Sequence, residues 1–253
     1  MSGRRCTYFL SDAHLGAAYI ADRRAHEGAL VAFLQSIEPT AATVYLLGDI
    51  LDYWFEYRTV VPRGYVRFFG QLAHMADAGI RIVWFTGNHD IWLFDYLRDE
   101  LGIEVADPKG GGMTVDIDGV RFFLGHGDDL GRQPLGYRLL RSTFRCRFLQ
   151  KLYSGIHPRW TLPFAHGWSS HSRKAAPPVP RLDGRTRTSL EVACRSLAAA
   201  DPELRYIVIG HHHVAIDEPV TASCRLIVLG DWIKQQTYAV FDGADLRLLS
   251  FSS

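Results

Sequence analysis

The chain has 253 residues, which is long enough for one large domain with a substantial core. Hydrophobic residues make up 47% and charged residues 22%, the balance of an ordinary globular protein. The formal net charge of +1 gives no global field for or against a nucleic-acid partner. No apolar run approaches the roughly 20 residues that a membrane-spanning helix needs.

The amino terminus and the cysteines indicate the compartment. Residues 1–7 run directly into an expected strand and lack the apolar core and cleavage site of a secretory signal. The four cysteines are scattered without a CxxC pair, at Cys6, Cys146, Cys194 and Cys224. This pattern is typical of free, mostly buried thiols in a reducing compartment. We therefore expect a cytoplasmic protein that at most lies on the face of a membrane.

The first expected strand, residues 8–10, leads into Asp12 and His14. These two residues are two positions apart, so their side chains leave the same face of an extended segment. Such a pair can clamp a metal ion at the end of a strand; a solvated loop is the alternative interpretation. Apolar residues at helical spacing then predict a helix over residues 21–37.

A second apolar strand, residues 43–47, ends in Gly48 and Asp49. Open α/β sheets place their sites at such strand ends. The carboxylate of Asp49 could bridge two cations there, or it could cap the start of a helix.

Four aromatic residues lie within residues 53–57, which is too dense for an ordinary loop. They form either a satellite core or the wall of an apolar substrate entrance. On the second interpretation, Trp54 and Tyr57 contact the substrate. A helix is expected next, over residues 66–76.

The third strand, residues 80–86, is rich in β-branched and aromatic residues and ends at Gly87. The glycine lets the backbone turn sharply, so the following side chains enter a shared cleft. Asn88 offers a neutral oxygen to a metal ion, His89 can carry a proton, and Asp90 can orient the His89 imidazole.

Residues 91–101 are expected to form a helix. Residues 113–124 have the alternation and Asp-Gly turn of a β-hairpin, and His126 follows its second strand. After a helix over residues 187–199, a strand at 204–209 leads through a glycine to His211 and His213, which share a face in an extended chain. The stretches 225–229, 237–241 and 246–251 read as antiparallel strands.

The segment of residues 132–187 contains twelve Arg or Lys residues and a single acid, with aromatic residues between them. Two amphipathic basic helices are predicted, over 135–153 and 160–174, and they suit a lipid headgroup layer, a diphosphate or a nucleic acid. A helical cap whose charges merely face water is the alternative. We therefore expect a core of residues 1–131 and 188–253 that carries a cap of residues 132–187.

Five strand ends supply seven oxygen and imidazole side chains: Asp12, His14, Asp49, Asn88, His126, His211 and His213. Such ligands without thiolates favour Mn, Fe or Zn over copper(I) or an iron–sulfur cluster. Seven ligands are too many for one small ion, and Asp49 can bridge, so we predict two ions about 3.5–4 Å apart. Two such cations activate a water and neutralise a phosphoryl oxygen, which indicates hydrolysis of a phosphate ester or diphosphate.

The order of these motifs resembles the calcineurin-like metallophosphoesterases. The pattern DxH, GDxxD, GNHD, GH and GHxH stands at residues 12–14, 48–52, 87–90, 125–126 and 210–213. The resemblance implies an α/β (α+β) fold of four layers, in which two packed mixed β-sheets are flanked by helices and carry a helical cap insertion.

The resemblance also implies roles for single residues. One ion would be held by Asp12, His14, Asp49 and His213, and the other by Asp49, Asn88, His126 and His211. The catalytic residues would be His89, which protonates the leaving group or holds the phosphate, and Asp90, which steadies it. A non-catalytic module on this fold would be free to lose ligands, whereas this chain has all seven.

The chain is most similar to the branch of this family that cleaves the diphosphate of UDP-2,3-diacylglucosamine in lipid A biosynthesis. The likeness rests on residues 11–16, 48–55 and 229–233 and on the basic insertion. It implies a UDP-linked diacyl glucosamine lipid substrate, two divalent ions, for which we expect Mn²⁺, and peripheral contact with the anionic inner-membrane surface. No nucleic-acid partner is expected. The alternative function is another phosphodiesterase that acts on nucleotide-sugar, cyclic-nucleotide or nucleic-acid diesters.

Two positions depart from that branch. Many members carry Arg where His89 stands. Where the family has a further acidic residue towards the insertion, this chain has Arg132, Gln133 and Pro134, so no role is transferred there. The predicted substrate-binding residues are Asn88, His89, Trp54, Tyr57, Ser172, Arg173 and Lys174, the last three by similarity to a Ser/Lys stretch of the cap.

Overall fold

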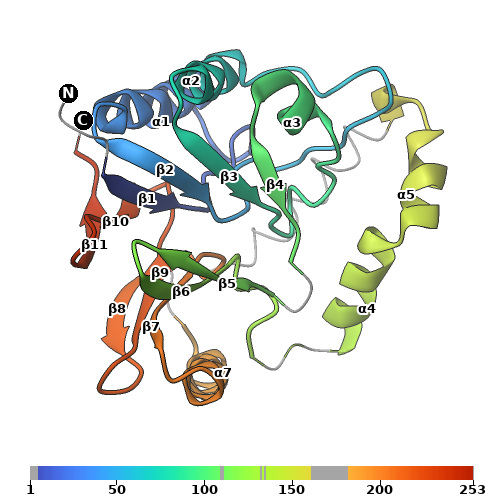
Figure 1. Cartoon of the computed structure of the whole chain (residues 1–253). Coiled ribbons are helices and arrows are strands. Elements are labelled where there is room, and N and C mark those ends of the chain that lie inside the picture. The colour runs from blue at the N-terminus through green and yellow to red at the C-terminus, as the bar shows by residue number, and fades with distance from the viewer. Residues whose placement is uncertain (1–4, 109–110, 132, 134, 161–181, 253) are drawn as a thin grey trace.

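The computed structural model describes residues 5–108, 111–131, 133, 135–160 and 182–252. The described part has four layers: a group of helices, a six-stranded sheet, a five-stranded sheet and a helix on the outer face of the second sheet (Figure 1). This arrangement confirms the predicted fold class. Among the described residues, no helix is long and apolar enough to cross a membrane.

The six-stranded sheet has the order β11-β10-β1-β2-β3-β4. Its strands are β1 (Cys6–Leu10), β2 (Ala41–Leu46), β3 (Arg81–Phe85), β4 (Glu104–Ala106), β10 (Thr237–Phe241) and β11 (Leu246–Ser250). Strands β1 to β4 are mutually parallel, whereas β10 pairs antiparallel with β1 and with β11. The loops that follow β1, β2 and β3 therefore emerge at one edge of the sheet.

The five-stranded sheet has the order β5-β6-β7-β9-β8. Its strands are β5 (Met113–Ile117), β6 (Val120–Gly125), β7 (Leu204–Ile209), β8 (Ala215–Pro219) and β9 (Arg225–Leu229). The β5–β6 hairpin was predicted. Of the three stretches predicted as antiparallel strands, β10 and β11 pair antiparallel with each other, whereas β9 lies in the other sheet, antiparallel to β8 and parallel to β7. Strand β9 is buried on both faces, which is typical of an inner parallel strand.

Helices α1 (Arg23–Ile37), α2 (Val66–Asp77) and α3 (Tyr96–Leu101) cover the outer face of the six-stranded sheet, and α7 (Gly184–Ala200) covers the other sheet (Figure 1). Three apolar clusters fill the spaces between the four layers. Helix α7 starts three residues before the predicted helix at 187, so it runs across the predicted boundary between cap and core.

Helix α3 is shorter than the predicted helix over residues 91–101. The buried carboxylate of Glu56 accepts hydrogen bonds from the main-chain N–H groups of Phe94, Asp95 and Tyr96. These bonds satisfy the N–H groups that a helix leaves unpaired at its start, so the helix begins at Tyr96.

Helices α4 (Leu135–Arg145) and α5 (Arg147–Ser154) stand where a single helix over 135–153 was predicted. The helix is interrupted at Cys146, whose backbone is extended. The carbonyl oxygen of Phe144 accepts hydrogen bonds from the Trp92 indole at 3.0 Å and from the Gln150 amide at 2.8 Å, so side chains replace the helical N–H donor. The predicted helix over 160–174 lies, beyond Trp160, outside the described residues, as do Ser172, Arg173 and Lys174.

Candidate metal centre

The seven predicted ligands converge at one end of the two-sheet sandwich. Loops after β1, β2 and β3 supply Asp12, His14, Asp49 and Asn88, and loops after β6 and β7 supply His126, His211 and His213. Both sheets therefore contribute to one site through the carboxyl ends of parallel strands.

Hydrogen bonds join the two sheets at this point. The main-chain N–H of His211 donates to Asp12 Oδ2 at 2.8 Å, and Nδ1 of His126 donates to the main-chain oxygen of Leu47 at 2.9 Å. Each bond links a loop of the five-stranded sheet to a loop of the six-stranded sheet. The positions of the donors are thus fixed by the packing of the sandwich.

The backbone is strained at most of these residues. Left-handed φ values occur at Asp12 (54°), His14 (44°), Asp49 (53°), His211 (68°) and His213 (54°). Such a conformation costs a non-glycine residue about 1–3 kcal/mol and is concentrated at functional sites. Neighbouring glycines allow the close approach, since a Cβ on Gly87 would lie 2.2 Å from Asp49 Oδ1 and one on Gly210 would lie 2.5 Å from Asp12 Oδ2.

The first donor group consists of Asp12, His14, Asp49 and His213. Nε2 of His14 lies 3.3 Å from Nε2 of His213 and 3.6 Å from Asp49 Oδ2. Asp12 Oδ1 lies 3.3 Å from Nε2 of His213 and 3.7 Å from Nε2 of His14. Two imidazoles that face each other between two carboxylates form a pocket for a cation.

The second donor group consists of Asp49, Asn88, His126 and His211. Nε2 of His126 lies 3.4 Å from Asp49 Oδ2 and 3.1 Å from Asn88 Oδ1. His211 offers a ring nitrogen within 4.8 Å of the donor atoms of Asp49 and His126. Asp49 Oδ2 thus faces both groups, which is the position that a bridging carboxylate requires.

The charges of these groups suit metal binding. Burial opposes ionisation of Asp12 and Asp49, but the adjacent histidines, His213 and His126 foremost, hold the pKa of each carboxyl well below its usual range. Burial lowers the pKa of His211 to about 3, so its imidazole is neutral at physiological pH. Ionised carboxylates and neutral imidazoles are the forms that bind metal ions. Burial opposes the charged form of His126, but Asp49 raises its pKa well above its usual value, so this imidazole would release a proton on binding an ion.

The donor atoms also fit a divalent transition metal. Asp12 Oδ1 is buried and accepts no hydrogen bond from any residue that the structure describes. A buried acceptor left without a partner costs about 1–3 kcal/mol, which a bound cation would offset. Oxygen atoms face Nδ1 of His14 and of His126, and this directs their Nε2 lone pairs towards the centre.

Asp90 does not contact the His89 imidazole, so the prediction that it orients this ring is wrong. The carboxylate of Asp90 is fully buried and accepts hydrogen bonds from the main-chain N–H groups of Gly87, Asp49 and Ile50. Its two oxygens hold the turn after β2 against the turn after β3. Asp90 thus shapes the centre through the backbone.

Asp52 supports the His89 imidazole instead, and the sequence analysis missed it. Nδ1 of His89 donates to the main-chain oxygen of Asp52 at 2.9 Å, and the Asp52 carboxylate lies 3.5 Å from Nδ1 of His14. The rings of His14 and His89 meet edge to face with their centroids 4.9 Å apart. The signal that could have found Asp52 is the second acid of the GDxxD motif.

Trp54 is a core residue, so the prediction that it contacts the substrate is wrong. Its side chain has no exposed surface, packs edge to face against Phe69 and donates to Glu56 Oε1 at 3.1 Å. The satellite-core interpretation therefore holds for Trp54. Tyr57 is half-buried and stays a predicted contact.

The other aromatic residues of this stretch hold helix α5 against the core. The hydroxyl groups of Tyr53 and Tyr153 are 3.0 Å apart, and the rings of Phe55 and Tyr153 lie 4.9 Å apart. Trp92 stacks on Tyr153 at an interplanar angle of 17°. This cluster holds α5, which is distant in sequence, close in space to Trp92, three residues after His89.

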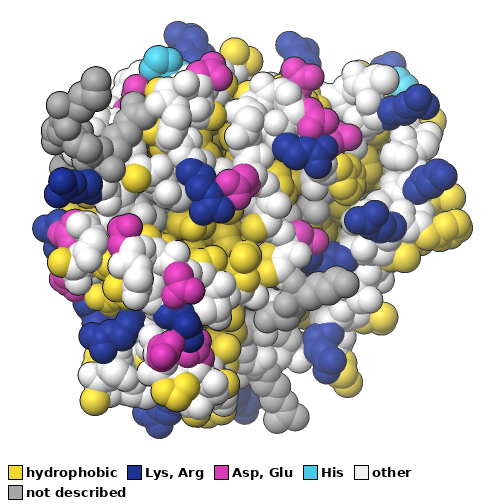
Figure 2. Space-filling view, viewed as in Figure 1, with side chains coloured by type: hydrophobic (Ala, Val, Ile, Leu, Met, Phe, Trp, Pro, Cys, Tyr) yellow, Lys and Arg dark blue, Asp and Glu magenta, His cyan; other side chains and the backbone are white. Residues whose placement is uncertain are grey.

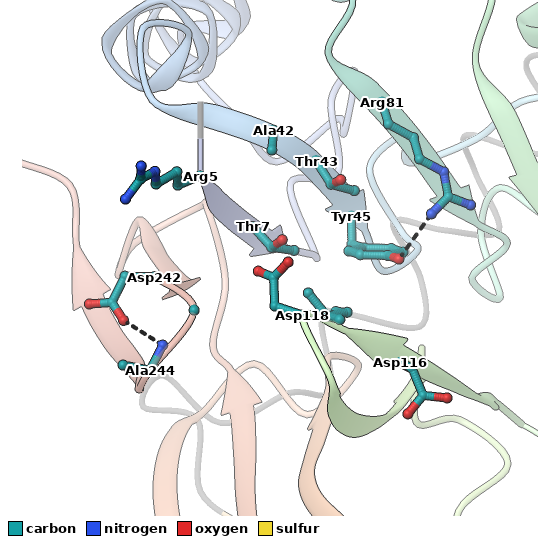
Figure 3. Close-up of a pocket in the computed structure, with 12 residues that line it drawn as sticks. Arg5, Thr7, Ala42, Thr43, Tyr45, Arg81, Asp116, Asp118, Asp242 and Ala244 are labelled. Carbon is teal, nitrogen blue, oxygen red and sulfur yellow. Dashed lines mark hydrogen bonds between the residues drawn. The ribbon is translucent and has the colours of Figure 1, made fainter. Parts of the chain in front are cut away.

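A cavity of about 680 Å³ lies at the opposite ends of the strands (Figure 3). It is lined by Thr7, Thr43 and Arg81 from the starts of β1, β2 and β3, and by Asp118 and Asp242 from hairpin turns. None of the seven ligands is among its described lining residues. The cavity is therefore separate from the metal centre.

Known proteins are similar to this chain over nearly its whole length. A UDP-2,3-diacylglucosamine hydrolase of Porphyromonas gingivalis is 39% identical over 255 residues, covering 96% of each chain. One of Aeromonas salmonicida is 29% identical and covers 96% of this chain and 92% of its own. A solved archaeal phosphodiesterase has a TM-score of 0.50 at 14% identity, over 97% of this chain and 99% of its own, and therefore shows a similar fold.

The family model described as calcineurin-like phosphoesterase matches residues 7–215, which include all seven predicted ligands. The match begins in β1 and ends in β8, so it contains every loop that carries a donor. It confirms the resemblance that the motif order indicated. The chain therefore belongs to the calcineurin-like phosphoesterase family and is a metal-dependent hydrolase.

Proposed function

We propose that this protein hydrolyses the diphosphate of UDP-2,3-diacylglucosamine to UMP and 2,3-diacylglucosamine 1-phosphate, a step of lipid A biosynthesis, with two Mn²⁺ ions. The observation that carries this proposal is Asp49 Oδ2, which faces Nε2 of His14 at 3.6 Å and Nε2 of His126 at 3.4 Å. A single carboxylate oxygen between two groups of donors suits a pair of ions. The names of the full-length relatives supply the substrate.

Two divalent ions, when bound, supply charge neutralisation at the diphosphate and an acidic water. The residues of the chain then orient the substrate. Asn88 and His89 lie on the turn after β3 and contact the phosphate that is attacked. His89 Nδ1 donates to the main-chain oxygen of Asp52, so in the imidazolium form, in which both ring nitrogens are donors, Nε2 can donate to a phosphate oxygen or to the departing phosphate.

We further propose that residues 132–187 act as a cap that binds the lipid part of the substrate. Within residues 135–160 of the cap, two cations are neutralised by the core: Arg141 pairs with Asp128 and Asp129, and Arg145 pairs with Asp107. The four other cations of this stretch form no ion pair within the described residues, namely Arg138, Arg147, Lys151 and Arg159. These four are free to meet an anionic ligand or surface.

Turnover of purified UDP-2,3-diacylglucosamine with Mn²⁺ tests the proposed substrate. We expect kcat/KM on the lipid to exceed that on a soluble diester, bis-p-nitrophenyl phosphate, by at least about 100-fold, because the acyl chains supply binding energy away from the reacting phosphate. Products are identified by mass spectrometry as UMP and the lipid monophosphate. Rapid cleavage of the soluble diester without cleavage of the lipid would assign the protein to the other phosphodiesterases of the family.

We also propose that the outer face of α4 and α5 lies on an anionic membrane surface. Large apolar side chains are exposed along these helices, at Leu135, Leu139, Phe148 and Leu152, and beyond them at Trp160, each more than 60% accessible. Basic residues alternate with them, and Figure 2 shows yellow and dark blue side chains together on the right of the molecule, where Figure 1 places α4 and α5. Helices that carry large apolar side chains on one face and basic residues on the polar face are typical of interfacial binding.

Sedimentation with lipid vesicles checks this surface. Replacing Arg147 and Lys151 with Gln is expected to weaken binding to phosphatidylglycerol vesicles about 30-fold, because each basic residue near an anionic surface contributes roughly 1 kcal/mol. Replacement of Arg24 and Arg67, exposed on α1 and α2, with Gln is the matched control. Equal losses for both pairs would indicate an effect of net charge alone and would remove the assignment to α4 and α5.

A further inference from the structure

The residues after β9 carry a motif that the ligands and the cap leave without a role. This motif is Leu-Gly-Asp-Trp-Ile at residues 229–233, and it lies beside the metal centre. Trp232 is buried and packs against Phe33 with ring centroids 4.8 Å apart. Its main-chain N–H donates to the main-chain oxygen of Asp12 at 3.2 Å. The turn is therefore anchored in the core and touches the first ligand.

Asp231 organises this turn. Its carboxylate is 2% exposed, and Oδ1 accepts hydrogen bonds from the main-chain N–H groups of Ile233 at 2.8 Å and Lys234 at 2.6 Å. Oδ2 accepts a bond from the side-chain amide of Gln235 at 2.8 Å. A buried carboxylate with several donors of this kind holds both the backbone and the Gln235 side chain in one conformation.

The Gln235 amide spans the segment that contains His213. Nε2 donates to the main-chain oxygen of His213 at 2.7 Å, and Oε1 accepts a bond from the main-chain N–H of Ala215 at 3.2 Å. The neighbours fix the orientation of the amide, because Nε2 meets two acceptors and Oε1 meets a donor. The side chain thus binds the segment on both sides of residue 214, as a partner strand would.

His213 is the ligand that needs such support. Its φ of 54° is left-handed, and its ring leaves the loop towards Asp12 and His14. A strained residue keeps its conformation only when its surroundings oppose relaxation. The bonds of Gln235 to His213 and Ala215 provide that opposition. From this geometry we propose that Gln235, held by Asp231, is a positioning residue for the His213 ligand and hence for one of the two ions.

The effect is confined to one donor group. His213 belongs to the group with Asp12 and His14, whereas His126 of the other group is held by the main-chain oxygen of Leu47. Loss of the Gln235 amide is therefore expected to weaken the first ion and leave the second unchanged. This inference rests on the two-ion centre of the proposed function.

Calorimetric titration of Mn²⁺ into chelator-treated, full-length protein tests the assignment. Gln235→Met keeps the length of the side chain and removes all three hydrogen bonds of the Gln235 amide. We expect one of the two Mn²⁺ affinities to fall roughly 10- to 100-fold, the usual effect of removing a group that orients a ligand. Electron paramagnetic resonance of Mn²⁺ is expected to change from a coupled pair to isolated ions. Gln35→Met, at an exposed position of α1, is the control.

Gln235→Glu separates positioning from packing, because Oε atoms still accept the Ala215 bond but no donor faces His213 or Asp231. It is expected to weaken the same ion as Gln235→Met. The inference would be overturned if the variant and the unaltered protein bound Mn²⁺ with equal affinities, or if both ions were weakened equally. The proposed function would still stand in that case, provided that the unaltered protein binds two ions. Fewer than two ions in the unaltered protein would contradict both. Thermal melting of the metal-free proteins shows whether Gln235→Met folds. If it does not, the Mn²⁺ affinities of Gln235→Glu test the inference.

Discussion

Asp49→Asn is expected to lower kcat by at least about 10³-fold and to reduce bound Mn²⁺ from two ions to fewer than one per chain. Asp49 Oδ2 is the carboxylate oxygen that faces both His14 and His126, at 3.6 and 3.4 Å. Amide oxygen lacks the negative charge that holds two cations together. Two ions contribute several kcal/mol to the stabilisation of the transition state, and each 1.4 kcal/mol is a factor of ten in rate.

The asparagine preserves the local fold. Asp49 Oδ1 accepts a hydrogen bond from the main-chain N–H of His89 at 2.8 Å, and an amide oxygen accepts it equally well. Elemental analysis and kcat on the lipid substrate are measured together, with Asp77→Asn at an exposed position of α2 as the control. A variant that retains two ions and more than a tenth of the activity would disprove the bridging role.

His89→Ala is expected to reduce kcat about 10²- to 10⁴-fold while both ions remain bound. A positioned acid contributes a factor of this size when it donates a proton to a leaving group or stabilises it. The ions remain because the bond from residue 89 to Asp49 uses the main chain, which alanine retains. Metal content and kcat therefore separate in this variant, whereas they fall together in Asp49→Asn.

His89→Arg divides the two roles proposed for this side chain. Arginine can hold a phosphate through its charge but does not release a proton at physiological pH. Activity that recovers to within about tenfold of the unaltered protein would assign His89 to phosphate binding. Activity as low as that of His89→Ala would assign it to proton transfer. His74→Ala, at an exposed position of α2, is the control. Loss of bound metal in this control, or in either variant at residue 89, would contradict the assignment.

The strand ends and their polar residues could be predicted from the sequence because each depends on local information. Apolar strands that end at a glycine and an acid, amide or histidine are visible in a window of ten residues, as at Asp49 and His126. Parallel strands bring such ends to one edge of a sheet, so the convergence of seven side chains follows once the strands are recognised. The family pattern then supplied the pairing of the two sheets.

Helix lengths and aromatic environments were harder to predict, because distant residues set them. Helix α3 begins at Tyr96 only because Glu56, forty residues earlier in the chain, binds its first N–H groups. The break at Cys146 follows from the bond that Trp92 makes to the Phe144 carbonyl. Trp54 reads equally well as core or as surface until α2 and α3 cover it.

The sequence by itself determined the identity of the donor atoms, their attachment to five strand ends and the membership of the family. Only the tertiary structure decided which residues support the histidines of the site, namely Asp52 in place of Asp90 beside His89, and Gln235 beside His213. A ligand is recognised by its own chemistry and by the strand before it. A residue that orients a ligand acts through a hydrogen bond between segments far apart in the chain, and neither segment contains a pattern that reveals the other.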